Sequence, residues 1–455
     1  MSLITNSPLY NISPLDGRYH KKTQLLTNFF SEFGFMKYRV EVEIKYFLFL
    51  IDTIKELEEI NKPEFKTQIL NIWKDFSLSD CELIKEFEFK CNHDVKAVEY
   101  FIGNKFSNIN LEKYISFIHF GLTSQDINNT SVTVSIKDFI YTHYIHNINM
   151  IIDQLNEMAD NWKKIVMLSR THGQPAVPST LGKEIKVFSY RLEKQLLNLQ
   201  SIEFYGKFGG AVGNLNAHFL AYPDIDWDFK LGNFLHNDLG LTREKFTTQI
   251  DNYENLSVIF DNVRRINTIL IDMNRDIWQY ISMDYLSQSF NKDEVGSSTM
   301  PQKINPINFE NSEGNLLLAN TLLDFMSNKL PVSRLQRDLT DSTILRNLGS
   351  IFGYCEIAYL NIMSGLSKIS PNIPKLEQDL NDNVSIITEG VQVILRKNGV
   401  KNAYEIVKDM SRGNKNLSIK EYQTFINSLD CIDTETKQLL LYLTPVTYVG
   451  NATKI

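Results

Sequence analysis

The stretch LSVIFDNVRRINTILIDMNRDIWQYI, residues 256–281, decides the fold. Its apolar residues recur every three or four positions, which traces one apolar stripe along an α-helix. Neither glycine nor proline occurs between Gly240 and Gly296, so nothing in the sequence interrupts a long helix there. A helix of this length buries its stripe against other long helices in a bundle. The stripe consists of Leu256, Ile259, Val263, Ile266, Leu270, Met273, Ile277 and Ile281.

Two further stretches lack helix breakers and indicate more long helices. Neither glycine nor proline occurs between Gly121 and Gly173, and residues 127–167 repeat the apolar pattern with more interruptions. Residues 183–205 form the other stretch. Because no strand-rich region or regular repeat is visible, we expect an all-α fold with a central long-helix bundle.

Changes along the chain in the length of helical segments and in the placement of prolines predict three domains. Residues 1–112 mix shorter helical segments with loops, whereas residues 113–366 contain the long helices. Pro371 and Pro374 then interrupt the chain, and shorter segments follow. We therefore expect smaller helical N- and C-terminal domains, 1–112 and 367–455, on either side of the bundle.

The composition excludes some functional classes. Of the 455 residues, 43% are hydrophobic and 22% are charged, which excludes a largely disordered chain. Lys and Arg number 47 against 54 Asp and Glu, a formal net charge of −7, so no broad basic surface for nucleic acid is implied. A small anionic substrate would need arginines that are gathered locally.

Neither a disulfide framework nor a targeting segment is predicted. The four cysteines are scattered and form no C-x-x-C pair. The N-terminal residues lack the charged and apolar regions of a signal peptide, and no apolar run approaches the roughly 18 residues of a membrane span. We therefore expect a cytoplasmic protein with no membrane contact. The cysteines are Cys81, Cys91, Cys355 and Cys431.

Two motifs resemble ligand sites but do not fit their patterns. The glycine cluster YGKFGGAVGN, residues 205–214, has Phe208 where a dinucleotide loop needs its first glycine, and no βαβ context surrounds it. His143 and His146 share a helical face and could bind a metal. No acidic residue or cysteine lies at helical spacing from these two histidines. The better interpretation is therefore that they are packed in the protein or exposed to solvent.

GSSTMPQKINP, residues 296–306, is the strongest local motif. Its glycine, hydroxyl residues and two prolines cannot continue the preceding helix, so a polar loop is predicted. Such a loop could bind an anion through Lys303, Asn305 and backbone N–H groups. Composition alone leaves a solvated connector as an equal alternative.

This motif resembles the signature loop of the fumarase/aspartase superfamily of β-eliminating lyases. Six further segments resemble the adenylosuccinate lyase family of bacteria, and the likeness runs from about residue 10 to about residue 450. The resemblance implies an all-α fold of three domains and homotetramers whose active sites use loops from more than one subunit. The segments are SPLDGRY (13–19), CNHDVKAVEYF (91–101), FGLTSQDINN (120–129), SRTHGQPAVPSTLGKE (169–184), FTTQID (246–251) and LPVSRLQRDLTDSTILRNLG (330–349).

The sequence departs from that family's pattern at two places. Gln302 stands where the family has histidine, and M-P-Q-K is closer to argininosuccinate lyases. The stretch that begins with Asn252, Tyr253 and Glu254 differs from the expected P-H-D-Y motif. An argininosuccinate lyase and a catalytically inactive helical scaffold of the same fold therefore stay open as alternatives.

The resemblance implies elimination of fumarate from adenylosuccinate, giving AMP, and from succinylaminoimidazole carboxamide ribotide, giving AICAR. It makes Ser297 the base, which must ionise in a dry, positively polarised pocket, with Ser298 beside it. Lys303 and Asn305 would stabilise the developing carboxylate charge. His172, which the Gly and Pro pattern places at a helix end, would be the general acid. Without the resemblance, a turn serine and a structural histidine would be the ordinary interpretations.

The resemblance also implies a set of substrate-binding residues. His93, between Asn92 and Asp94, would hold substrate or support the general acid, with Asp94 orienting its ring. Thr123 and Ser124 precede a long helix that is predicted to begin near Asp126. The N-terminus of that helix suits a carboxylate, although simple N-capping explains both residues equally. The others are Gln249 for the succinyl group or the base and Arg18, Tyr19, Arg337, Ser342 and Arg346 for the phosphate. No metal or organic cofactor is implied.

Overall fold

The computed structural model describes residues 8–289, 300, 303–411 and 417–455. Within it the chain divides into two compact units. The division into three consecutive domains stays a prediction. Unit 1 comprises Met1–Asn147, Gln195–Thr268 and Gly314–Tyr359, and unit 2 comprises Ile148–Lys194, Ile269–Glu313 and Leu360–Ile455.

The long helices predicted from the sequence are present. Every stripe residue from Leu256 to Ile277 is buried in α12, and Ile281 near the helix end is half-buried. A π-helical turn at Ile140–Tyr144 joins α7 to α8, so the chain is helical throughout 124–162. The long helices are α7 Ser124–Phe139, α8 Ile145–Trp162, α9 Leu181–Gln200, α12 Glu254–Ser282, α13 Ile307–Lys329 and α15 Leu348–Leu366.

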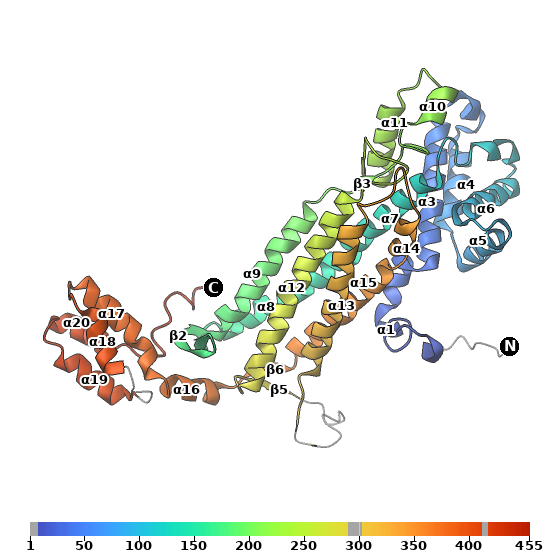
Figure 1. Ribbon diagram of the computed structural model, residues 1–455. Coiled ribbons are helices and arrows are strands. Elements are labelled where there is room, and N and C mark those ends of the chain that lie inside the picture. The colour runs from blue at the N-terminus through green and yellow to red at the C-terminus, as the bar shows by residue number, and fades with distance from the viewer. Residues whose placement is uncertain (1–7, 290–299, 301–302, 412–416) are drawn as a thin grey trace. The chain divides into compact units, whose positions relative to one another are not determined.

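The N-terminal part of unit 1 packs around one apolar helix, α3. Its N-cap Ser31 accepts a hydrogen bond from Gly34 N, and most of its residues are buried because helices contact several of its sides. The contacting helices include α4, α5, α6 and α7 (Figure 1). The helices of this part are α1 His20–Thr23, α2 Thr27–Phe30, α3 Glu32–Ile51, α4 Pro63–Lys74, α5 Leu78–Cys91 and α6 Asp94–Asn108.

Shorter helices complete both units. In unit 2 the C-terminal helices enclose a core of their own around Ile387, Leu395 and Tyr422. Unit 1 contains α10 Asn216–Ala221, α11 Trp227–Phe234 and α14 Thr340–Leu345. Unit 2 contains α16 Ile373–Asn381, α17 Thr388–Lys397, α18 Ala403–Ser411, α19 Ile419–Ser428 and α20 Thr434–Leu441.

Strands are few and short in the described residues. Each of three sheets has two strands. Of the two sheets in unit 2, one overlaps the motif at residues 169–184, and the other includes a strand that precedes the motif at residues 296–306 in the sequence. The pairs are antiparallel β1 Val166–Thr171 with β2 Gln174–Thr180, parallel β3 Tyr205–Gly206 with β4 Thr242–Arg243, and antiparallel β5 Leu286–Gln288 with β6 Ile369–Pro371. Helices dominate, so the predicted all-α class is confirmed. Across the described ranges, no helix combines the length and the apolarity that a bilayer span requires.

Candidate active site

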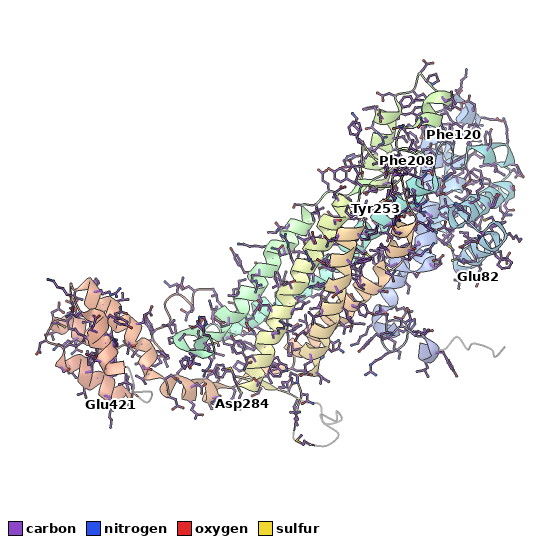
Figure 2. All side chains as sticks on the ribbon, in the orientation of Figure 1. Glu82, Phe120, Phe208, Tyr253, Asp284 and Glu421 are labelled. Carbon is purple, nitrogen blue, oxygen red and sulfur yellow. The ribbon has the colours of Figure 1, made fainter. Side chains whose placement is uncertain are left out.

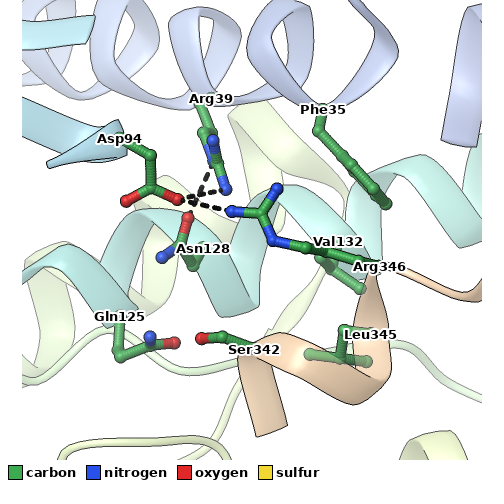
Figure 3. A pocket seen from close by; sticks show the side chains of 9 residues that line it. All are labelled: Phe35, Arg39, Asp94, Gln125, Asn128, Val132, Ser342, Leu345 and Arg346. Carbon is green, nitrogen blue, oxygen red and sulfur yellow. Dashed lines mark hydrogen bonds and ion pairs between the residues drawn. The ribbon is translucent and has the colours of Figure 1, made fainter. Parts of the chain in front are cut away.

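In unit 1 a pocket forms where α3, α6, α7 and α14 meet (Figure 3). Its volume is about 30 Å³. Asp94 Oδ2 accepts hydrogen bonds from Arg39 Nη2 at 2.9 Å and from Arg346 Nη2 at 3.1 Å. The structure thus brings the predicted residues Asp94, Ser342 and Arg346 together. The pocket is lined by Phe35, Arg39, Asp94, Gln125, Asn128, Val132, Ser342, Leu345 and Arg346.

The two guanidinium groups keep the central carboxylate charged. Burial favours neutral Asp94, but the charges of Arg39 and Arg346 and a hydrogen bond from Val95 N outweigh it and lower the pKa of Asp94. Arg346 also donates through Nη1 to Glu32 Oε2 at 3.2 Å. A ligand anion would therefore meet cations that carboxylates already hold in place.

The histidine beside this pocket is not oriented as expected. His93 is the N-cap of α6, and its Nδ1 accepts a hydrogen bond from Lys96 N at 3.2 Å. An acceptor Nδ1 carries no proton to donate, and it lies 3.8 Å from Asp94 Oδ1. Capping thus orients this exposed ring instead of Asp94. Asn92 precedes it in the left-handed conformation, with φ of 52°.

Arg337 and Ser342 form a second polar pair in unit 1. Arg337 Nη2 donates to Ser342 Oγ at 2.9 Å. Ser342 and Arg346 line the same pocket from α14 and its C-cap, as their spacing predicted. The six-residue α14 is shorter than the helix expected over the whole segment 340–349.

A neighbouring cavity of about 240 Å³ reaches the N-terminal segment. Arg346 lines it together with Asp16 and His20, which flank Arg18 and Tyr19 in the sequence. The Arg18 guanidinium lies 5.8 Å from the centroid of the Tyr19 ring. The N-terminal loop thus stands next to Arg346, but Arg18 and Tyr19 are not among the residues that line the cavity.

The N-terminus of α7 is built around a buried ion pair. Thr123 N donates to Asp126 Oδ2 at 2.8 Å in a capping box, with Ser124 as the first helical residue. Asp126 Oδ1 accepts from Lys207 Nζ at 2.7 Å and from Gly209 N at 2.8 Å. The glycine cluster is therefore a structural loop held by Asp126, in agreement with the rejection of a dinucleotide site.

Gln249 lies in a loop that contacts two other loops. Its Nε2 donates to Ala211 O at 3.1 Å, and its backbone N donates to Gln336 O at 3.2 Å. The side chain is half-buried. This loop therefore connects the glycine cluster to the segment that carries Arg337.

His172 lies in unit 2, and its predicted helix-end position is wrong. It occupies the tip of the β1–β2 hairpin, with φ of 53° followed by 73° at Gly173. Two successive residues of positive φ form the tight turn that suits a hairpin. The breaker-free stretch ends in a strand because α8 stops at Trp162. The His172 side chain is exposed.

The carboxylate of Asp379 links this hairpin to two other segments of unit 2. It accepts from Tyr285 Oη at 2.8 Å, from Lys375 Nζ at 2.8 Å and from Arg170 Nη2 at 3.5 Å. Burial opposes ionisation, but these partners lower the pKa of Asp379. A cavity of about 740 Å³ beside it is also lined by Gly173 of the hairpin.

The signature loop is described only at its C-terminal side. Ser297, Ser298 and Gln302 lie outside the described residues. Lys303 is exposed, and its backbone N donates to Met300 O at 3.0 Å. Asn305 is half-buried, and its carbonyl accepts from Ile307 N at 2.9 Å just before α13. Both residues belong to unit 2, as His172 does.

Sequence reasoning missed three polar residues of the unit 1 pocket, Arg39, Gln125 and Asn128. Arg39 is 7% exposed and donates through Nε to Asn128 Oδ1 at 2.8 Å. Gln125 is fully buried on α7. An arginine within the apolar run of α3 is the signal that could have revealed the pocket, since buried arginines need acidic or polar partners.

No metal site is formed by the described residues. They contain no group of three His, Cys, Asp or Glu side chains arranged to hold an ion. His143 Nε2 instead lies 2.9 Å from Glu356 Oε2, which also accepts from Asn147 Nδ2 at 2.8 Å. His146 is exposed. His143 is therefore a packed histidine paired with a carboxylate.

Comparisons with solved structures confirm the fold. A fumarate lyase from Mesorhizobium superposes with a TM-score of 0.76 at 17% identity, covering 95% of this chain and 96% of the other. A 3-carboxy-cis,cis-muconate lactonizing enzyme from Pseudomonas putida gives 0.73 at 16% identity, covering 95% of each chain. Identities this low establish the architecture alone.

Comparisons of sequence are more specific. Residues 17–319 match a lyase family model, and residues 333–449 match that of the adenylosuccinate lyase C-terminal region. The adenylosuccinate lyase of Dictyostelium discoideum is 47% identical over 99% of both chains. That of Haemophilus influenzae is 45% identical over 99% of this chain and 98% of its own, and that of Escherichia coli is 43% identical over 98% of both. These matches confirm the resemblance seen in the sequence: the chain belongs to the adenylosuccinate lyase family of the fumarase/aspartase superfamily.

Proposed function

We propose that this chain is a carbon–nitrogen lyase that releases fumarate from adenylosuccinate, giving AMP, and from succinylaminoimidazole carboxamide ribotide, giving AICAR. The observation that carries the proposal is the convergence of Arg346 and Ser342 on Asp94 in one pocket, with Arg337 bonded to Ser342. Such a group of cations and hydroxyls suits a phosphate. Argininosuccinate carries no phosphate, so the argininosuccinate lyase alternative leaves this group without a ligand.

The chemistry needs a base, an acid and a site for negative charge. In the proposed reaction, ionised Ser297 takes a proton from the carbon next to a carboxylate of the succinyl group. Lys303 and Asn305 stabilise the negative charge that then develops on that carboxylate. The carbon–nitrogen bond breaks with its electron pair leaving on nitrogen, and His172 protonates that nitrogen. Ser298 acts as a neighbouring ligand.

The remaining predicted residues bind the substrate. Thr123 and Ser124, at the N-terminus of α7, receive a carboxylate of the succinyl group. His93 and Asn92, which precede the pocket residue Asp94 in the sequence, hold the nucleotide, and Gln249 bonds the succinyl group or the base. Arg18 and Tyr19 complete the phosphate site next to Arg346. The exposed positions of His93 and His172 leave both imidazoles accessible to a ligand.

We further propose a cytoplasmic homotetramer in which each active site combines residues from several subunits. Large apolar side chains are exposed on the long helices, a feature of surfaces that bind other protein surfaces. They belong to both units, which suits an assembly through the bundle helices. Those on α9, α12 and α13 are Val187, Tyr190, Leu197, Val258, Trp278, Ile307, Leu317, Leu318 and Phe325.

The decisive experiment gives the purified protein adenylosuccinate and argininosuccinate in parallel. We expect an absorbance change as fumarate leaves adenylosuccinate and no turnover of argininosuccinate. Ser297→Ala is the matched control and should bind adenylosuccinate without converting it. Turnover of argininosuccinate alone would overturn the substrate assignment. Binding of adenylosuccinate without turnover by the native chain would support the inactive scaffold.

A further inference from the structure

Tyr253, which is labelled in Figure 2, joins three segments of unit 1 through buried hydrogen bonds. The residue is 1% exposed and precedes α12 with φ of 63°. Its hydroxyl accepts a hydrogen bond from Asn129 Nδ2 of α7 at 2.5 Å and donates one to Asp341 Oδ2 of α14 at 2.9 Å. A non-glycine residue held at positive φ, with both hydroxyl functions used, is a fixed point of the structure.

Asp341 connects Tyr253 to Arg337 and Ser342, which are proposed to bind the phosphate. Its Oδ1 lies 3.6 Å from Arg337 Nη2, which donates to Ser342 Oγ. Asp341 Oδ1 and Arg337 Nε are buried without hydrogen-bond partners among the residues described. The guanidinium is therefore attracted by Asp341 without being saturated by it. Because Ser342 Oγ accepts from Arg337, its own proton is free to be donated to an anion.

Two backbone contacts attach the Gln249 loop to the same junction. Asp251 N donates to Asn129 Oδ1 at 2.8 Å, and Tyr253 N donates to Asp251 Oδ1 at 2.6 Å. Gln249 N donates to Gln336 O, the residue before Arg337. The positions of the Gln249 loop and of the Arg337 loop are thus coupled through buried hydrogen bonds.

We propose that Tyr253 is a positioning residue for the phosphate site, because its hydroxyl holds Asp341 where that carboxylate orients Arg337 and Ser342. The inference rests on the proposed function for the identity of the anion. Removal of the hydroxyl leaves Asn129 Nδ2 and Asp341 Oδ2 buried without this partner, which frees Asp341 to leave its present position 3.6 Å from Arg337 Nη2. Arg337 and Ser342 would then lose the orientation in which they bind phosphate.

The test is Tyr253→Phe in the full-length enzyme. The KM for adenylosuccinate should rise about tenfold while kcat changes by less than about threefold, because the lost contact orients a binding group. A second readout compares inhibition by AMP and by adenosine, which differ in the phosphate. The inhibition constant for AMP should rise about tenfold and that for adenosine should stay unchanged.

Tyr359→Phe is the matched control. Tyr359 is equally buried in unit 1, and its hydroxyl donates to Asn267 Oδ1 at 2.6 Å. Its loss should leave the ratio of the two inhibition constants unchanged. Asp341→Asn keeps the shape but removes the charge, and it should reproduce the selective loss of AMP if Tyr253→Phe does not fold.

Three outcomes would overturn the inference. One is equal weakening of AMP and adenosine by Tyr253→Phe, or no change in either. Another is a selective loss of AMP in Tyr359→Phe as well, which would make the effect a general result of core disruption. If the native enzyme itself does not prefer AMP to adenosine, the proposed phosphate site fails together with the inference.

Discussion

Two carboxylates, Asp251 in unit 1 and Asp379 in unit 2, show how differently the units treat buried charge. Asp251 is 6% exposed and accepts a hydrogen bond from Tyr253 N, and it forms no ion pair within the described residues. Burial raises its pKa from 3.8 to about 7. Asp379 has Lys375 and Arg170 as partners, and its pKa is lowered. The hydrogen bonds around Asp251 thus involve a carboxylate that burial pushes toward its neutral form, whereas unit 2 holds the His172 hairpin with paired charges.

The largest effect is expected from His172→Ala, which removes the exposed imidazole at the tip of the unit 2 hairpin. Loss of a general acid should lower kcat by about 10²- to 10⁴-fold, with little change in KM because binding is assigned to unit 1. Steady-state kinetics with adenylosuccinate measure both. A residual kcat within about tenfold of the native value would assign protonation to another group.

Mixing a variant of unit 1 with a variant of unit 2 tests whether the two units contribute to one active site from the same subunit. His172→Ala removes a group of unit 2, and Arg346→Met removes one of unit 1. If the chain forms the proposed homotetramer and one active site takes its unit 1 and unit 2 residues from different subunits, mixed tetramers contain some complete sites and regain activity. Failure to regain activity, with mixed oligomers demonstrated by mass, would mean that each site is formed within one subunit.

A smaller effect on kcat is expected from Asp379→Asn. A neutral amide attracts Arg170 less strongly, so the hairpin should hold His172 less firmly and kcat should fall about tenfold. Lys375→Met is the matched control, because Lys375 contacts the same carboxylate from within α16 and leaves the hairpin bond intact. Steady-state kinetics again decide. Equal losses of kcat in both variants would show that activity depends on the charge balance around Asp379 and not on its contact with the hairpin.

The sequence predicted the parts of this molecule that follow from local pattern. The apolar stripe of α12 and the spacing of Ser342 and Arg346 are determined by helix periodicity, and both are found in the structure. The hairpin around His172 was missed because its two strands are defined by pairing with each other, which a count of glycines and prolines does not detect. The pairing of the two strands, and not the local helix breakers, therefore determined the hairpin conformation around His172.

The contents of the unit 1 pocket show the same limit. Arg39 reaches Asp94 and Asn128 across segments that are far apart in the chain, so its role depends on tertiary contacts. The environment of Asp251 likewise arises from burial after folding. Local motifs therefore identified the residues of the proposed chemistry but not the network that orients them.

The smallest predicted effect is on stability and concerns Asp251→Asn. Between about pH 4 and pH 7 the folded protein keeps a proton on Asp251 that the unfolded chain has released, so stability falls as pH rises through this window, by at most about 1.4 kcal/mol per pH unit. The variant has no such group. Its thermal midpoint relative to the native protein, at one protein concentration, should therefore be higher at pH 8 than at pH 5. An unchanged difference would mean that Asp251 is ionised in the fold, as Asp379 is.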